Sequence, residues 1–446
     1  MTIRITKLRP ADRKILSIAL PAIVSNITVP LLGLVDVTIA GHLGSAAYIG
    51  AIAVATMVFN VIYWLFGFLR MGTSGLTAQA FGSRSLTAAS TTLARSLMVA
   101  LIAALAIVAL QVPLGDIAIR ATGAAGDIAT SAHTYFSICV WGAPAMLGLY
   151  ALTGWFIGMQ NTRIPMLVAI VQNVVNIAAS LFFVYALHWG VEGIASGTLV
   201  SQYAGLLISI ALWARFYGVR MFHRVEWGSV CRKAELLRFF SVNRDIFFRT
   251  LFVIVVNFSF LSIGASQGAI ILAVNTLLMQ LFTLFSYIMD GFAYAGEALC
   301  GHLYGAGNAV ELRRMVRRLF LWGGVLTVVY TLAYALGGSD FLSLLTNDSN
   351  VVAAASHYFA WAVLIPVAGV AAFVWDGVFI GMTATRGMLA ATAVAAVVFL
   401  AVNALLSSTL HNHALWLAFI LFLFTRGAVQ TYVYNRKSFW HGFLSK

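Results

Sequence analysis

Five acidic residues lie inside stretches of the sequence that are otherwise apolar. They are Asp36, Asp245, Asp290, Glu297 and Asp376. A charge inside a membrane-spanning segment costs at least ~2.5–3.5 kcal/mol on insertion scales, so each one needs a partner or a function. The bases that we assign to these stretches are only three, namely Arg70, Arg244 and Arg249. At least two acids must therefore be protonated, solvated, ion-bound or sharing a base. Such carboxyls are natural carriers of coupling protons, because burial disfavours their charged form.

Asp36 is the strongest candidate among these acids. The segment LLGLV directly before it is wholly apolar, and the only base that we assign to span interiors of the N-terminal half is Arg70. Pro21 and Pro30 lie upstream, and each removes a helix hydrogen bond and favours a kink. We therefore interpret Asp36 as an acid whose protonation changes how the first helix packs or bends. The alternative is a carboxylate satisfied by neighbouring Asn or Tyr groups, with a role in packing alone.

Five neutral polar residues could surround that acid. Three of them follow one another at intervals of three and four residues, which places them near one face of a helix, and two more lie four residues apart on the next helix. They are Asn173, Asn176, Ser180, Thr198 and Gln202. We predict that they form a polar pocket in the N-terminal half. Hydrogen bonding that merely holds the helices together is the alternative.

The C-terminal half contains a second set of charges. We expect some of its members to form salt bridges that hold this half together, with cation recognition or a second proton route as the alternative. The members are Arg244, Asp245, Arg249, Asp290, Glu297 and Asp376.

An enzyme is not indicated. The segment GTSG at 72–75 fits the GxSG pattern of intramembrane serine proteases, but small residues at this spacing more often allow close helix packing. Zinc-protease, nucleotide-binding and dinucleotide motifs do not occur, and the three cysteines show no metal-binding or disulfide spacing. We therefore expect no metal site and no cofactor apart from a coupling ion.

The composition of the chain indicates that these residues lie in a lipid bilayer. Hydrophobic residues make up 61% of the 446 residues and charged residues only 9%, and the mean hydropathy is +0.93. An ordinary soluble domain has about 25% charged residues. A soluble enzyme, a nucleic-acid-binding domain and a disordered chain are all excluded, so the partners are the lipid bilayer and small molecules. The net charge of +13 reflects basic cytoplasmic loops.

Apolar runs long enough to span a bilayer recur along the chain, and we predict an all-α multi-pass membrane protein with twelve transmembrane helices. Loops on one side are rich in Arg and Lys, which places both termini in the cytoplasm and the protein in the inner membrane. The predicted spans are 14–40, 47–80, 92–114, 130–158, 164–187, 191–216, 239–263, 269–303, 315–337, 352–381, 388–409 and 413–434.

The sequence repeats itself at a constant offset. FIGMQNTR at 156–163 and FIGMTATR at 379–386 share six of eight residues, at a separation of 223. Six spans per repeat give both copies the same orientation, so the repeats are parallel. We predict an N-terminal six-helix lobe at 1–216, a cytoplasmic linker at 217–237 and a C-terminal six-helix lobe at 238–446. Two such lobes around a central cleft favour a transporter over a channel.

Four segments resemble those of multidrug and toxic compound extrusion (MATE) transporters, and in particular the DinF-like branch. They are LPAIVSNITVPLLGLVDVTIAGHLG (20–44), NRDIFFRT (243–250), DGFAYAGEALCGHLYGAGN (290–308) and WDGVFIG (375–381). The resemblance covers essentially the whole chain. It implies a V-shaped pair of six-helix bundles that exports organic cations or other amphipathic compounds, driven by inward flow of protons or sodium.

The resemblance also implies roles for single residues. Asp36 matches the acid of the first span that is central to coupling, Asn176 and Thr198 match polar partners, and Pro21 matches a proline associated with helix bending. Asp376 matches an acid that is important in the related sodium-coupled branch. Where several relatives have a second acid, this chain has Ser180, which leaves a sodium site with one carboxylate and favours protons.

These observations lead to one functional prediction. The protein is a monomeric antiporter of the inner membrane that exports amphipathic or cationic drugs and toxic compounds in exchange for protons, with sodium as the alternative ion. A flippase of lipid-linked precursors is the alternative function, but it needs a basic cavity for phosphates. An intramembrane enzyme would depend instead on Ser74.

Overall fold

The structure is a computed structural model that describes residues 9–41, 46–346, 348–436 and 440. Within these residues every regular element is a helix. Eleven helical stretches of the described chain are long and apolar enough to cross a membrane, and they correspond to the predicted spans from the second to the twelfth. The first predicted span corresponds to helix α1, Pro10–Gly41, in which several side chains lie outside the described part. The protein is therefore a multi-pass, all-α membrane protein, as predicted.

Contacts divide the chain into two compact units. Unit 2 consists of residues 24–243 and unit 1 of residues 1–23 and 244–446. Two long helices, α1 (Pro10–Gly41) and α12 (Lys233–Ser266), begin in one unit and end in the other. This division differs from the predicted lobes at the beginnings of these two helices: residues 1–23 belong to unit 1 together with the second repeat, and unit 2 extends to residue 243. The predicted lobe boundaries themselves stay a prediction.

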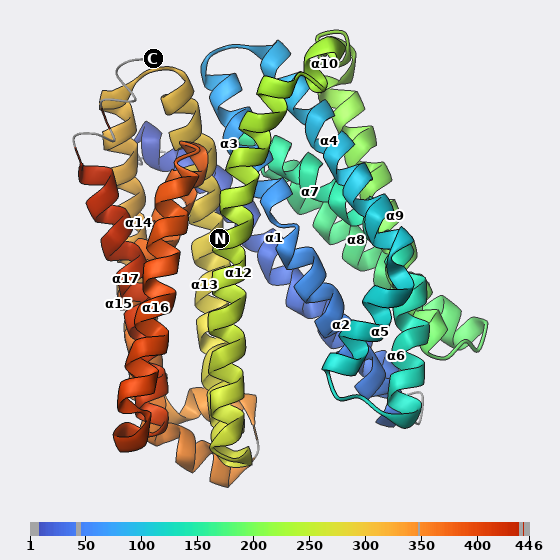
Figure 1. The fold of residues 1–446 in the computed structure, drawn as a ribbon, viewed down its shortest axis with the longest axis vertical. Coiled ribbons are helices and arrows are strands. Elements are labelled where there is room, and N and C mark those ends of the chain that lie inside the picture. Colours follow the sequence, from blue (N-terminus) through green and yellow to red (C-terminus); the bar gives the residue numbers. More distant parts are fainter. Residues whose placement is uncertain (1–8, 42–45, 347, 437–439, 441–446) are drawn as a thin grey trace. The chain divides into compact units, whose positions relative to one another are not determined.

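Unit 2 is built around packed helix pairs, with α3 on α7, α2 on α6 and the consecutive helices α8 and α9 on each other (Figure 1). The predicted span at 47–80 is interrupted at Gly67, so that it forms two helices, and the span at 92–114 likewise ends early at Ala109. The helices are α2 (Ala46–Leu65), α3 (Phe68–Gly82), α4 (Leu86–Ala109), α5 (Gln111–Ala121), α6 (Gly126–Cys139), η2 (Val140–Gly142), α7 (Ala143–Gly158), α8 (Arg163–Leu181), η3 (Phe182–Ala186), α9 (Val191–Trp213), η4 (Ala214–Gly218), α10 (Val219–Phe222) and α11 (Trp227–Val230).

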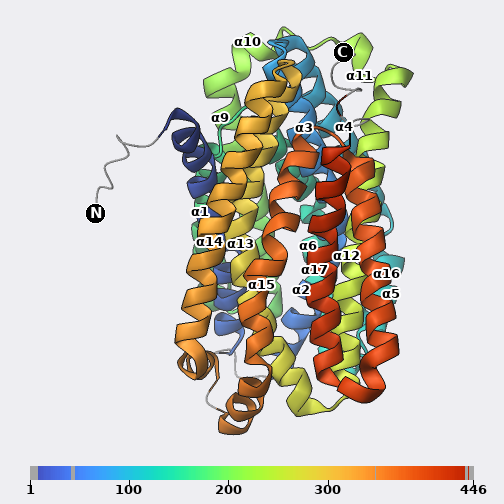
Figure 2. The ribbon, with the colours of Figure 1, turned by 90° about the vertical axis from the view of Figure 1, so that its left-hand side faces the viewer.

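Unit 1 contains five further long helices. Helix α15 packs on α13, α14 and α17, and α16 packs on α17 (Figure 2). The helices are α13 (Ala269–Gly305), α14 (Ala309–Leu345), α15 (Ser349–Gly381), α16 (Thr385–Leu410) and α17 (Asn412–Asn435).

The backbone confirms the tandem repeat at an offset of 223 residues. Non-glycine residues rarely adopt positive φ, yet Gln160 (φ 61°) and Thr383 (φ 52°) both do so, and these positions are 223 residues apart. His188 (φ 55°) and His411 (φ 46°) form a second such pair. The two copies therefore share a positive φ at both of these corresponding positions.

Helix packing is repeated at the same offset. A Cβ atom on Gly154 of α7 would lie 2.2 Å from the carbonyl oxygen of Arg70 on α3. A Cβ atom on Gly377 of α15 would lie 2.2 Å from the carbonyl oxygen of Ala293 on α13. Gly158 likewise approaches the backbone of Ser74. Small residues thus bring two helix backbones into contact in each repeat, and the GTSG segment belongs to this contact.

Candidate functional site

Asp36 lies in the part of α1 that belongs to unit 2, and its side chain is buried. Its Oδ1 atom accepts no hydrogen bond from the part of the chain that the structure describes. The carboxyl is close enough to Tyr135 and Cys139 of α6 to act on both electrostatically. A buried charge without a donor is costly, and binding of a proton or a cation removes that cost.

Tyr135 begins a short hydrogen-bonded chain across three helices. The Tyr135 hydroxyl lies 3.5 Å from the Thr198 hydroxyl of α9, and the Asn176 amide of α8 donates to Thr198 at 3.1 Å. Asn176 is fully buried and its Oδ1 has no partner among the described residues. Two of the predicted pocket residues, Asn176 and Thr198, are therefore joined directly.

The other predicted pocket residues have different surroundings. Asn173 donates to the carbonyl oxygen of Thr28 at 3.0 Å, and so links α8 to α1. Ser180 is fully buried against Gly197, next to Thr198, and its hydroxyl has no partner within the described chain. Gln202 is buried against Gly142 at the junction between α6 and α7. That all five residues form one pocket stays a prediction.

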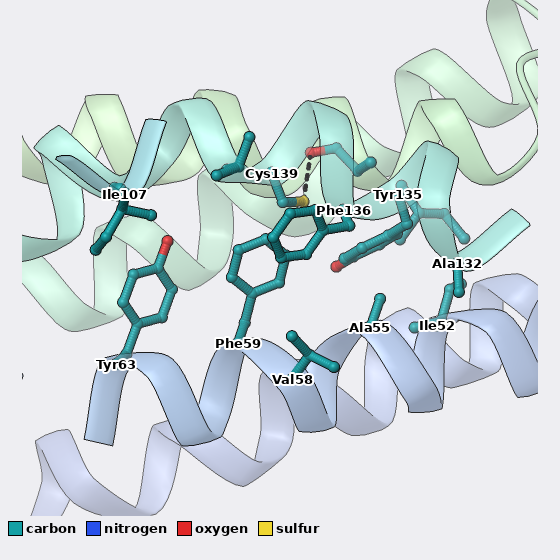
Figure 3. Packing of buried hydrophobic residues seen from close by; sticks show 14 of the residues in the cluster. Ile52, Ala55, Val58, Phe59, Tyr63, Ile107, Ala132, Tyr135, Phe136 and Cys139 are labelled. Atoms are coloured by element: carbon teal, nitrogen blue, oxygen red, sulfur yellow. Dashed lines mark hydrogen bonds between the residues drawn. The ribbon is translucent and has the colours of Figure 1, made fainter. Parts of the chain in front are cut away.

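Tyr135 is the member that the sequence analysis did not identify. It lies in a buried apolar cluster in which Phe59 of α2 stacks on Phe136 at 5.0 Å between ring centroids (Figure 3). The Cys139 thiol donates to the carbonyl oxygen of Ala195. One side of the polar chain is thus an apolar wall, which excludes water and strengthens electrostatic interactions within the site.

Helix α1 runs without interruption from Pro10 to Gly41, across Pro21 and Pro30. The side chain of Pro30 lies outside the described residues. The unit boundary follows Ile23, two residues after Pro21. Bending of α1 at these prolines stays a prediction.

Asp376 of α15 has surroundings opposite to those of Asp36. Its Oδ2 atom is paired with the guanidinium groups of Arg249 on α12 and of Arg426 on α17, the latter at 2.6 Å. Its Oδ1 accepts a hydrogen bond from Gln430 at 3.0 Å. All four side chains are buried. Two guanidinium groups and an amide donor favour the charged carboxylate, as expected for a salt-bridged cluster; cation recognition or a proton route at Asp376 stays untested.

The other charged residues predicted for the C-terminal half have contacts of their own. Asp245 pairs with the largely exposed Arg244 at 3.2 Å and accepts a hydrogen bond from Thr385 at 3.0 Å. Asp290 interacts electrostatically with Arg426 of the Asp376 cluster. Glu297 is fully buried where α13 meets α15. Salt bridges of the expected kind are thus present at Asp245 and at Asp376, and their role stays a prediction.

The count of bases in the sequence analysis was wrong. Besides Lys14, Arg215, Arg317 and Arg318, which lie near the ends of their predicted spans, it omitted Arg426 of the twelfth predicted span and Arg95 of the third. The side chains of Arg426 and Arg95 are both buried. The apolar sequence around each arginine was the available signal. Within the described chain no group of three or more His, Cys, Asp or Glu side chains gathers as metal ligands.

Comparison with known proteins identifies the family. The MatE family model matches residues 21–182 and 246–405. The chain is 37% identical to DNA damage-inducible protein F of Escherichia coli (strain K12) over 96% of this chain and 93% of that protein. It is 24% identical to human multidrug and toxin extrusion protein 1, over 78% of this chain and 61% of that protein.

Solved structures show the same fold. A MATE crystal structure in the bent conformation superimposes with a TM-score of 0.88 at 20% identity, covering 98% of both chains. A MOP superfamily transporter from Pyrococcus furiosus has a TM-score of 0.83 at 19% identity, covering 98% of this chain and 97% of that one. Transporters of this family need no cofactor. The chain therefore belongs to the MatE family of multidrug and toxin extrusion transporters, and it is a membrane transporter and not an enzyme.

Proposed function

We propose that this transporter is an antiporter of the inner membrane that exports amphipathic or cationic compounds in exchange for protons, with Asp36 as the coupling acid. The observation that carries the proposal is the buried Oδ1 atom of Asp36, which has no donor among the described residues. A carboxyl in this position can alternate between a proton and a cationic substrate, since each removes the cost of the buried charge.

The partners of Asp376 argue against this role for it. A proton that binds Asp376 would have to overcome the attraction of Arg249 and Arg426, which both contact the same oxygen. A sodium ion at this carboxylate would experience repulsion from the same two cations. In this proposal the coupling ion therefore binds in unit 2.

Sodium is the alternative coupling ion, because other oxygen atoms of the pocket are also unpaired. Asn176 Oδ1 and Ser180 Oγ are buried and accept no hydrogen bond from the described part of the chain. Cations with oxygen preference bind such groups. With Ser180 in place of a second acid, however, the predicted pocket residues include one carboxylate, that of Asp36, which favours a proton.

The substrate class follows from the charge of the site and from the relatives. An acidic pocket attracts a cation and repels the phosphates of a lipid-linked precursor, which argues against a flippase. The human relative is named a multidrug and toxin extrusion protein. Both termini lie in the cytoplasm in this proposal, and the transporter acts as a monomer.

Transport by proteoliposomes tests the proposal. Proton and sodium gradients are imposed separately, and movement of the fluorescent cation ethidium is followed in wild type and in Asp36→Asn. We expect a proton gradient to drive movement in wild type only. Asp116→Asn is the matched control, since that carboxylate is half exposed at the surface. Undiminished proton-driven transport by Asp36→Asn would contradict the mechanism, and movement driven by sodium alone would select the alternative ion.

A further inference from the structure

Four charged residues form two ion pairs that are related by the repeat. Arg95 of α4 and Arg318 of α14 are separated by 223 residues, and so are Asp12 of α1 and Glu235 of α12. The pairing is crossed: Arg95 Nη1 lies 3.8 Å from Glu235 Oε2, and Arg318 Nη1 lies 3.6 Å from Asp12 Oδ2. Each repeat therefore uses its arginine to hold the beginning of the other repeat's first helix.

The contact in unit 2 is extensive. The Arg95 guanidinium is buried and donates to the carbonyl oxygens of Ser229 at 2.8 Å and Val230 at 3.1 Å. One turn earlier on α4, the Thr91 hydroxyl accepts a hydrogen bond from the backbone N–H of Glu226 at 3.2 Å. The segment before α12 is thus fastened along α4 through its backbone.

The beginning of α12 is also packed closely within unit 2. A Cβ atom on Gly72 of α3 would lie 2.1 Å from Asn243 Oδ1. Helix α12 therefore has contacts in unit 2 from the residues before it up to Asn243, where the unit ends.

The contact in unit 1 holds the beginning of α1 in the corresponding way. The Asp12 side chain is buried, and besides the pairing with Arg318 it accepts a hydrogen bond from the Trp322 indole at 3.2 Å. A Cβ atom on Gly291 of α13 would lie 2.4 Å from Ile23 Cγ1 and 2.9 Å from the carbonyl oxygen of Ala19. Residues from Asp12 to Ile23 are thus packed within unit 1.

We propose that Arg95 and Arg318 are positioning residues for transport that act as a reciprocal pair of fixed anchors. In this proposal, which rests on the transporter function, the first part of α1 moves with unit 1 and the first part of α12 moves with unit 2. Any movement between the units is then taken up within α1 and α12, beyond the anchored segments. Separating either pair would leave a buried charge without its counter-ion, which is strongly unfavourable. The anchors therefore stay closed throughout the cycle.

Arg318→Gln and Arg95→Gln test the anchors, with Arg314→Gln as the matched control. The Arg314 side chain is 68% exposed on the same helix as Arg318. Ethidium affinity and maximal transport rate are measured for each variant. We expect anchor variants to bind ethidium as wild type does but to lose about tenfold or more in maximal rate, because the released beginnings of α1 and α12 no longer move with their units. The control keeps both values.

Hydrogen exchange of the full-length protein shows which helix segment is loosened in each anchor variant. In Arg318→Gln we expect faster exchange over residues 10–23 and unchanged exchange over 24–41, while Arg95→Gln speeds exchange over 226–243. The exchanged pair Asp12→Arg with Arg318→Asp should restore both exchange and transport rate. No such restoration is expected for Arg95, because its guanidinium also binds two carbonyl groups.

Two results would overturn the proposal. A maximal rate equal to that of wild type would show that the anchors do not matter for transport. A parallel loss of affinity and rate, with faster exchange throughout the chain, would show a general structural role. If wild-type protein neither binds nor moves ethidium, the proposed substrate class fails, and the exchange measurements alone decide on the anchors.

Discussion

At the scale of single residues, two buried aspartates have opposite surroundings. Asp36 has an oxygen atom that accepts no hydrogen bond within the described chain, whereas Asp376 is paired with two arginines and a glutamine. The same side chain is therefore suited to exchange a proton in one unit and to hold three helices together in the other. The neighbours of a carboxyl decide its role.

Proton competition at Asp36 predicts the pH dependence of substrate binding. As the pH falls, Asp36 becomes protonated and loses the charge that attracts a cation, so ethidium affinity should decrease. As the pH rises, the carboxylate forms and affinity should increase. In Asp36→Asn the affinity should be weak and independent of pH over the same range. Equilibrium binding of ethidium in detergent, measured over a range of pH, gives the affinity of wild type and of Asp36→Asn. An unchanged pH dependence in the variant would assign the titration to another group.

The Asp376 cluster predicts a large effect on stability. In Asp376→Ala, Arg249 and Arg426 would both remain buried without their shared counter-ion, which should destabilise the protein by about 3–5 kcal/mol. Arg314→Ala removes an exposed ion pair with Glu311 and should cost less than about 1 kcal/mol. Thermal unfolding in detergent compares the two. Equal stability of the variants would mean that the buried cluster contributes no more than a surface pair.

At the scale of helices, the two repeats share the atomic detail of their packing. Ser85 accepts a hydrogen bond from the backbone at the beginning of α4, and Asn308, at the corresponding position, does the same for α14. Both residue types favour this capping position. The repeats have therefore kept helix starts, helix ends and close contacts while most side chains diverged.

Close backbone contact predicts that equivalent glycines respond alike to substitution. Gly154→Ala and Gly377→Ala each place a methyl group 2.2 Å from a carbonyl oxygen of a neighbouring helix, so each should destabilise its unit by about 1–3 kcal/mol. Gly324→Ala is the control, since no atom lies within 4 Å of its Cβ position, and it should be neutral or slightly stabilising. Unfolding temperatures in detergent measure all three. A tolerated alanine at only one of the two positions would show that the contacts are not equivalent.

The sequence predicted the helices better than it predicted the side-chain contacts between them. Apolar runs and the repeated FIGM segment specify the spans, because lipid permits only helices or closed barrels. The pairing of Asp376 with Arg426 was missed, since the two residues are fifty positions apart and meet only through packing of α15 on α17. Tyr135 was missed for the same reason, because its relation to Thr198 depends on where α6 and α9 touch. Local periodicity carries no information on such contacts.

At the scale of the whole molecule, labelling of the native cysteines can determine the orientation of the chain in the membrane. Cys231 is exposed in the segment between the repeats, whereas Cys139 and Cys300 are buried. If that segment is cytoplasmic, a membrane-impermeant maleimide should label inside-out vesicles and leave right-side-out vesicles unlabelled. Cys231→Ser should abolish the labelling, which makes the two buried cysteines internal controls. Labelling from the outside would reverse the proposed topology.

The exchange of helix beginnings between the units has a consequence for how such a chain could arise. A polypeptide with one repeat would have both an arginine and the acid of its first helix, but not the crossed pairing of the present chain. Two copies would reproduce that pairing by swapping their first turns, in the manner of a domain-swapped homodimer. A six-helix ancestor of this protein would thus have folded as a dimer, and co-expressed halves of the present chain should assemble by the same mutual exchange.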